Sequence, residues 1–463
     1  MTTIAAPPAS FSDLATALDG RLVTPRDRDW DDVRQVFNLT TDLRPAAILL
    51  ARGPGDVVSA MELARRQGLR VAAQATGHNA SAYGDLSDTL LVDVRDLREV
   101  EVDAARRLVR VGAGVRWQDV VPQLSELGLA ALHGSSPLVG IAGYSLGGGI
   151  GWLARTHGMQ TNSVTAFEVV TPDGLLRHVS ADRDADLFWA LRGGNGSYGV
   201  VTAIEFRVYP VPQLYAGASF FPLDRAREVL AAWTSMAPSL PEELMTWVQL
   251  MRFPDAPELP EPLRGGAFAV LLGAYLGDEE SGAALLAPVR DLGPVMDSFA
   301  PSRPVDLAEL AMDPPAPVPF ASTTALVDDL DADTLDRLVE LVGAGSGSEL
   351  PLVQLRQMGG ALARAEHGAG ARATLAGEFC VFALGVVADE ASGQATARDL
   401  AAIDRLLAPH RVGAYPNFVE DPGTDPRTFW DAETWSRLTA VKAAYDPADL
   451  LRGNHPVPPA PAG

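Results

Sequence analysis

The sequence predicts an α+β fold of two parts, a glycine-rich N-terminal half and a middle region with an antiparallel sheet covered by helices. In the first half, a strand–helix–strand pattern is followed by two hairpin patterns. From about residue 211, long strand-like runs alternate with amphipathic helices, which favours an antiparallel sheet covered on one face. A tail beginning near residue 411 differs in character from both and carries one more helix.

Composition limits the class of protein and its partners. The 463 residues are 47% hydrophobic and 21% charged, which is typical of a soluble globular protein with two or three domains. The formal charge of −22 repels nucleic acid and anionic membranes, so neither is expected as a partner. No apolar run approaches about 18 residues, so no membrane span is predicted. The first residues, MTTIAAPPASFSDL, lack a basic region followed by an apolar one, so we expect a cytoplasmic protein.

Metal and disulfide chemistry are disfavoured by the cysteine and histidine patterns. Cys380 is the single cysteine and lies in the apolar run EFCVFALGVV, which indicates a buried strand residue and excludes an internal disulfide. The seven histidines are scattered without HExxH or another paired spacing. No metal ion is therefore predicted.

The first half begins with an expected strand over 45–52, a helix over 54–68 and a second strand over 69–74, which favours a parallel crossover. A turn-rich loop follows at 76–85. Hairpins are expected over 98–114 and 164–180, with helices at 114–128 and 184–194 and a long strand at 196–211. The GxG in the first hairpin lacks the third glycine of a Rossmann site, and GGGIG at 147–151 lacks the ending of a P-loop.

The middle region and tail supply the remaining elements. Strands are expected at 215–221, 244–253, 267–277, 321–327, 350–358 and 377–387. Helices are expected at 224–236, 281–292, 332–342, 395–407 and 432–445.

The stretch GSSPLVGIAGYSLGGGIG, 134–151, is the densest glycine segment, with seven glycines among eighteen residues. Glycine at that density gives up chain entropy and side-chain packing, so a stable fold needs a reason for it. A surface loop is one interpretation, but the apolar residues between the glycines imply burial. Close approach of backbone N–H groups to a cofactor, most often at a phosphate, is the favoured one.

Four motifs, in order, resemble the berberine-bridge-enzyme-like branch of the vanillyl-alcohol-oxidase and p-cresol-methylhydroxylase flavoprotein superfamily. They are QATGHNASAYG at 74–84, the glycine-rich stretch at 134–151, DLFWALRGGNGSYGVVT at 186–202, and YPNF at 415–418 followed by RLTAVKAAYDPADLLRGNHP at 437–456. The resemblance that they carry extends over essentially the whole chain.

The resemblance implies a two-part FAD-binding domain of the p-cresol-methylhydroxylase type over 1–210, a substrate domain over 211–410, and a tail over 411–463 that returns to the FAD domain. It implies FAD linked covalently through His78. By the same resemblance, the residues expected to contact FAD are Ala75, Thr76, Gly77, His78, Asn79, Ala80, Gly84, Ser135, Ser136, Gly140, Gly143, Gly147, Gly148, Gly149, Gly151, Gly199, Val200, Asn417 and Asn454.

Two departures from the family pattern change the expectation. Gln74, Ala75 and Thr76 stand where relatives usually have arginine and additional glycine, so backbone N–H groups must hold more of the diphosphate charge. Ser136 stands where many relatives have a second flavin-linking cysteine. A serine hydroxyl cannot form that thioether, so no second link is expected.

Oxidation of an alcohol carbon needs a base for the O–H proton as hydride leaves for the flavin. Tyr415 matches the family's Y-x-N element and is the first candidate, provided that a positive or donor group lowers its pKa. Tyr144 could assist, and Glu378 on a middle-domain strand is a further alternative. Asn454 is expected at the edge of the flavin ring by resemblance.

The sequence thus predicts an FAD-dependent oxidoreductase acting on a hydroxyl group of a small molecule, a sugar or a secondary metabolite, with oxygen as the electron acceptor. Oxidative carbon–carbon ring closure and a dehydrogenase that avoids oxygen are alternatives. A flavin-fold protein that binds a small molecule without turnover is an alternative of another class. The sequence leaves the oligomeric state and the substrate open.

Overall fold

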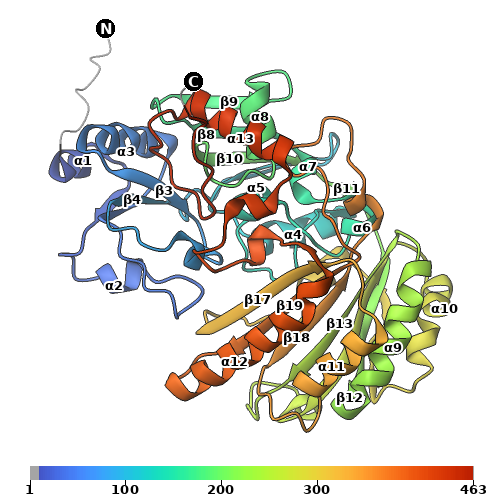
Figure 1. Cartoon of the computed structure of the whole chain (residues 1–463). Helices are drawn as coiled ribbons and strands as arrows, with labels where there is room; N and C mark the ends of the chain where they lie inside the picture. Colours follow the sequence, from blue (N-terminus) through green and yellow to red (C-terminus); the bar gives the residue numbers. More distant parts are fainter. Residues whose placement is uncertain (1–9, 462–463) are drawn as a thin grey trace.

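A computed structural model describes residues 10–461 and shows two sheets from the N-terminal half beside one large sheet from the middle of the chain (Figure 1). Residues 1–9, on which most of the expectation about a secretory signal falls, lie outside the described part. Within residues 10–461, no helix has the length and apolar character needed to cross a membrane.

The first sheet has the order β1-β2-β4-β3, formed by Arg21–Val23, Ala47–Leu50, Thr89–Asp93 and Arg70–Gln74. β1 is antiparallel to β2, whereas β2 and β3 are both parallel to β4, which lies between them. The connecting helix α3 (Pro54–Gln67) has proline in its first turn and ends at Gly68 in the left-handed region, φ 67°. Both features are typical of helix ends, so the expected crossover is confirmed.

The second sheet has the order β5-β6-β10-β8-β9 and is antiparallel throughout. Its strands are Val100–Asp103, Leu108–Gly112, Val200–Arg207, Val164–Val170 and Leu176–Ser180. Both expected hairpins are therefore confirmed. Buried residues from both sheets, such as Val92 and Phe167, form one apolar core together with α3, α4 (Trp117–Glu126) and α8 (Ala185–Leu191).

The third sheet is antiparallel and has the order β15-β12-β14-β13-β18-β19-β17-β20, with β16 also on β12. Its strands are Met296–Asp297, Leu214–Pro222, Ala267–Tyr275, Leu244–Arg252, Leu352–Gln357, Phe379–Val386, Phe320–Val327, Arg411–Gly413 and Ala300–Ser302. Helices α9, α10, α11 and α12 cover one face (Figure 1): Ala226–Met236, Glu279–Arg290, Ala332–Val342 and Glu390–Leu407. Cys380 is fully buried in β19, as expected.

Alternation along the strands sends side chains to opposite faces of the third sheet. On β13, Leu244, Val248 and Leu250 pack in the core beneath the helices, whereas Met245 and Trp247 pack on the opposite face. That opposite face meets residues of the N-terminal half, including Trp152, in a separate buried cluster. The helix-free face of the sheet therefore forms the junction between the two halves of the molecule.

The remaining helices are α1 (Phe11–Ala17), α2 (Trp30–Val33), α5 (Ile141–Gly147), α6 (Ala154–His157), α7 (Gln160–Ser163) and α13 (Ala432–Tyr445). A short two-stranded pair joins β7 (Leu129–Ala130) to β11 (Tyr209–Pro210). Short 3-10 turns are η1 (Ala80–Tyr83), η2 (Leu223–Arg225), η3 (Ala237–Ser239), η4 (Glu261–Leu263), η5 (Pro304–Ala308), η6 (Gly360–Ala363), η7 (Ala408–His410), η8 (Pro416–Phe418) and η9 (Pro426–Phe429).

The tail returns to the N-terminal half, where α13 lies beside α8 and the second sheet (Figure 1). Past α13, the chain runs beside β3, and Val71 exchanges backbone hydrogen bonds with Leu450 and Arg452. The buried Lys442 ammonium donates to Asp446 at 2.6 Å and to the carbonyls of Ser197 and Leu451. One buried cation thus joins the end of α13 and the segment after it to Ser197, which is distant in sequence.

This ion pair generates a stability prediction. Asp446→Asn keeps the side-chain shape but leaves the Lys442 ammonium without its buried carboxylate, and breaking a buried pair costs about 3–5 kcal/mol. Urea unfolding should show a loss of that order. Asp449→Asn is the control, because the Asp449 side chain is 30% exposed and its pair with Lys442 is longer, at 3.2 Å. The control should lose less than about 1 kcal/mol; equal losses would contradict this account.

Candidate active site

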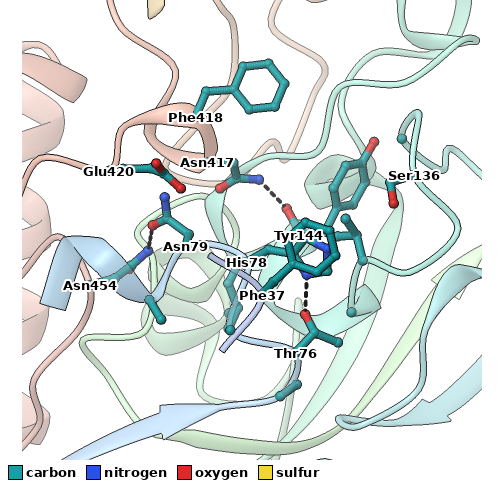
Figure 2. A pocket seen from close by; sticks show the side chains of 18 of the residues that line it. Phe37, Thr76, His78, Asn79, Ser136, Tyr144, Asn417, Phe418, Glu420 and Asn454 are labelled. Carbon is teal, nitrogen blue, oxygen red and sulfur yellow. Dashed lines mark hydrogen bonds between the residues drawn. The ribbon is translucent and has the colours of Figure 1, made fainter. Parts of the chain in front are cut away.

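A cavity of about 310 Å³ lies at the junction between the halves. One wall comes from the end of β3 with the loop after it, from the glycine-rich segment, and from α5. The other comes from the helix-free face of β17, β18 and β19. The turn η8 of the tail closes the cavity, and Figure 2 shows Asn417, Phe418 and Glu420 facing His78 and Asn79 across it.

Most of the residues expected at a cofactor line this cavity. They are Ala75, Thr76, Gly77, His78, Asn79, Ala80, Ser135, Ser136, Gly140, Gly143, Gly199, Asn417 and Asn454, together with the two candidate bases Tyr144 and Tyr415. Six expected residues are not among its lining: Gly84, Gly147, Gly148, Gly149, Gly151 and Val200.

The glycines of 147–151 are packed closely against other parts of the protein. The segment is helical at α5, and a Cβ on Gly147 would lie 1.7 Å from the Asn417 side chain. A Cβ on Gly151 would lie 1.8 Å from the His133 carbonyl, and one on Gly149, at φ 90°, would reach the Tyr144 ring at 2.5 Å. These four glycines do not line the cavity, and their contact with a cofactor stays a prediction.

Gly84 and Val200 also lie outside the lining of the cavity. Gly84 has φ 64° and ends η1, and its missing Cβ would face Pro422. The Val200 side chain is fully buried in the core beneath the second sheet.

Two glycines of the same segment do face the cavity. Gly143 lies within α5, and a Cβ there would meet no atom within 4 Å. A Cβ on Gly140 would have only ordinary contacts, at 3.5 Å or more, with Ala75 and Thr76. These positions leave the backbone of the first turns of α5 open to a ligand.

His78 is fixed in orientation by two neighbours. Its ring stacks on Phe37 with 4.0 Å between centroids, and Nδ1 lies 2.8 Å from the Thr76 hydroxyl (Figure 2). Nε2 is buried and has no hydrogen-bond partner within the described residues. Burial, and to a lesser degree the charge of Arg116, lowers the pKa of His78 to about 4, so the ring is neutral at pH 7.

The hydroxyl of Tyr415 accepts two hydrogen bonds. The Gly149 N–H donates at 2.8 Å and the Asn417 amide at 2.9 Å, while the same amide also donates to the Tyr144 carbonyl at 3.0 Å. Burial raises the pKa of Tyr415, and the bond from Gly149 and the charge of Arg372 oppose that rise. Burial outweighs the donors, so the lowered pKa that we expected for this base is not what the structure shows.

The other candidate bases are less well placed. The Tyr144 hydroxyl donates to the Leu132 carbonyl at 3.0 Å, and burial raises its pKa well above the usual value. Glu378 does not line this cavity; it lies at a separate hollow beside Arg155 and Arg364. Tyr415 therefore remains the candidate whose hydroxyl is presented at the junction.

Comparisons with known proteins give a consistent result. Residues 45–180 match the family model of the FAD binding domain. The chain is 25% identical to (R)-6-hydroxynicotine oxidase of Paenarthrobacter nicotinovorans over 97% of this chain and 99% of that protein. Glucooligosaccharide oxidase of Sarocladium strictum is 34% identical over 40% of this chain and 38% of its own length. The structure of BBE-like 1 from Physcomitrella patens superposes with a TM-score of 0.84 at 20% identity, covering 98% of this chain and 100% of that one.

The chain is an FAD-linked oxidoreductase with the fold of the berberine-bridge-enzyme-like flavoproteins. The expected fold class and the FAD cofactor are thereby confirmed, and an enzyme is favoured over a protein that binds without turnover. The cavity fits the cofactor, because it offers the open backbone of α5, apolar walls and the unpartnered Nε2 of His78.

The sequence analysis missed the far wall of this oxidoreductase's cavity. That wall consists of Phe320, Ser322, Leu352, Gln354, Arg356, Phe382 and Leu384, with Asp313 and Glu420 nearby. Alternation along the strands could have grouped several of these residues, but their contact with the N-terminal half could not be read from the chain. Burial raises the pKa of Glu420 to about 7, although Ser322 and Asn38 donate hydrogen bonds to it.

Gly147, which packs against a side chain, and Gly143, which faces the cavity, should respond differently to substitution by alanine. Gly147→Ala should lose about 1–3 kcal/mol of unfolding free energy, because the added methyl displaces Asn417. Gly143→Ala should be no less stable than wild type, because alanine favours a helix, yet it should carry less flavin because its methyl enters the cavity. Thermal unfolding and the flavin-to-protein absorbance ratio measure both effects. A Gly143→Ala protein with full flavin content would contradict a cofactor beside α5.

Proposed function

We propose that this oxidoreductase oxidises a hydroxyl group of a small molecule, a sugar or a secondary metabolite, with Tyr415 accepting the proton and oxygen accepting the electrons. The observation that carries the proposal is the position of the Tyr415 hydroxyl. The Gly149 N–H and the Asn417 amide hold it at the cavity between the two halves of the molecule. When bound, FAD supplies the hydride acceptor.

The residues that would hold FAD follow from the cavity. The backbone at Gly140 and Gly143 and the hydroxyls of Ser135 and Ser136 line the wall formed by the N-terminal half. Asn454 donates a hydrogen bond to the Asn79 side chain, and Asn79 donates to the Val419 carbonyl at 2.8 Å. These amides tie the tail to the His78 loop, at the end of the cavity where we place the flavin ring.

His78 is the proposed attachment point. A neutral imidazole nitrogen with a free lone pair is a nucleophile, and the low pKa of His78 keeps the ring neutral. Nε2 carries that lone pair in the tautomer in which Nδ1 holds the proton and donates to the Thr76 hydroxyl. Stacking on Phe37 and contact with Thr76 hold the ring in one orientation. The Ser136 hydroxyl accepts from the Leu138 N–H at 3.3 Å and offers no second link.

Proton removal by Tyr415 requires the phenolate. The Gly149 N–H and the Asn417 amide stabilise that form, because hydrogen bonds donated to an anion favour it. The raised pKa of Tyr415 implies that little phenolate exists at neutral pH before the substrate binds. The proton then moves from the substrate hydroxyl to the Tyr415 oxygen as hydride leaves the same carbon.

Covalent attachment is tested by denaturation. Wild-type protein should keep flavin fluorescence on a denaturing gel, and His78→Ala should release all its FAD into the supernatant. Ser136→Ala is the control and should stay fluorescent, because Ser136 makes no link. Release of all flavin from denatured wild type would disprove attachment at His78.

The base is tested by anaerobic stopped-flow reduction across pH, with a substrate found by a screen for peroxide formation. Tyr415→Phe should slow reduction by about 10² to 10⁴, the usual contribution of a general base, with a smaller change in substrate affinity. Wild-type reduction should accelerate with rising pH, because the raised pKa of Tyr415 makes phenolate scarce at neutral pH; the variant should lose that dependence.

Tyr144→Phe is the control for Tyr415, because its hydroxyl is bonded to a backbone carbonyl. Its reduction rate should stay within about threefold of wild type, well short of the loss expected for a base. A Tyr415→Phe rate in that same range would place the base elsewhere. Oxygen consumption during turnover distinguishes an oxidase from a dehydrogenase that avoids oxygen. The mass of the product distinguishes oxidation of a hydroxyl group from oxidative ring closure.

A further inference from the structure

Arg356 has an unusual position in the active-site cavity. Alternation along β18 places Val353 and Leu355 in the core beneath the helices and sends Gln354 and Arg356 to the opposite face. That face lines the cavity, and Arg356 is 4% exposed there. A guanidinium so deeply buried needs a reason, because burying a charge is costly unless it is paired.

The other buried arginines have such a reason. Arg155 donates to the carbonyls of Leu244, Leu240 and Met358, Arg192 to that of Gly368, and Arg372 to those of Gly147 and Phe429. Each of the three ties segments of backbone together, and none of them lines the active-site cavity. Arg356 differs, because its hydrogen bond in the described structure goes from Nε to the Gln354 side chain.

The guanidinium of Arg356 packs over two aromatic rings. It lies 4.0 Å from the centroid of Trp247 and 4.8 Å from that of Phe418. Trp247 in turn stacks on Trp152 at 3.6 Å, so the platform is buried and rigid. With Nε held by Gln354, the two terminal nitrogens form a fixed, planar pair of donors.

No carboxylate within the described residues pairs with this cation at 4.0 Å or less. Asp313 is an acid that interacts with Arg356 at longer range. Burial raises the pKa of Asp313, while a hydrogen bond from Ser135 and the charge of Arg356 oppose the rise. The protein therefore leaves the positive charge of Arg356 without a close partner of its own.

We propose that Arg356 binds a carboxylate of the substrate, so that this enzyme oxidises hydroxylated carboxylic acids. The inference rests on the proposed oxidation of a hydroxyl group and names the substrate class. A carboxylate matches the planar pair of terminal nitrogens and carries one charge, which a single guanidinium neutralises. The apolar rings of Phe382 and Phe418 on the same wall suit the carbon skeleton.

Benzoate is the probe, because binding can be measured without turnover. Titration of the oxidised holoenzyme with benzoate should quench tryptophan fluorescence or perturb the flavin spectrum, since Trp247 stacks on Arg356. The neutral isostere benzamide is the ligand control. Benzoate should bind about 10- to 100-fold more tightly than benzamide, the range of a charge-assisted hydrogen bond. Equal affinities in wild type would overturn the proposal.

Substitutions of Arg356 test whether this side chain causes the preference for benzoate over benzamide. Arg356→Gln should reduce the ratio of benzoate to benzamide affinity to about one, because the charge-assisted bonds are lost. Arg356→Lys keeps the charge but not the planar fork, so it should retain a smaller preference for benzoate. It also keeps the proposal testable if the glutamine variant fails to fold. An unchanged ratio in either folded variant would place anion binding elsewhere and overturn the assignment.

The binding test is independent of the proposed reaction. Tyr415→Phe should bind benzoate as wild type does, because the deleted hydroxyl is not a ligand of the carboxylate. Benzoate selectivity that depends on Arg356, together with normal flavin reduction in Tyr415→Phe, would keep the anion site and reject the base. Phenyl phosphate should bind no more tightly than benzoate; tighter binding would replace the carboxylate class with a phosphate.

Discussion

The hydrogen bonds that Tyr415 and Asn417 make with the glycine-rich segment are the constraint on which the active site depends. Gly149 donates to the Tyr415 hydroxyl, and the Asn417 amide bridges that hydroxyl and the Tyr144 carbonyl. The same contact requires glycine at 147, because a Cβ there would overlap Asn417. The tail and α5 are thereby held together at one cavity, and the third sheet supplies its opposite wall.

Burial is the dominant electrostatic influence in this cavity. It lowers the pKa of His78 and raises those of Tyr415 and Glu420, so each group is driven toward its neutral form. The stability contribution of His78 is lost as pH falls from 6.5 toward 4, because the unfolded state then binds more protons. That of Glu420 is lost as pH rises from 4.5 toward 7, so the two contributions oppose each other.

The sequence predicted the elements better than the site. Local signals located α3 by its Pro54 and Gly68 ends, and Asp173–Gly174 located a hairpin turn. The motifs predicted that His78 and Tyr415 belong to one site, and both residues line the same cavity. Glycine density alone could not separate Gly143, which faces the cavity, from Gly147, which meets a side chain from the tail. Arg356 was missed because the face to which a strand residue points depends on pairing between distant segments.

The central claim is that one cavity holds FAD between His78 on one wall and Arg356 on the other, with Tyr415 in the tail segment that closes it. A crystal structure of the flavin-loaded protein tests it most directly. The account predicts electron density for the flavin ring beside α5, continuous with the His78 side chain, with the Tyr415 hydroxyl and the Arg356 guanidinium facing the same open space. Flavin density outside this cavity, or a flavin ring that contacts neither His78 nor α5, would contradict it.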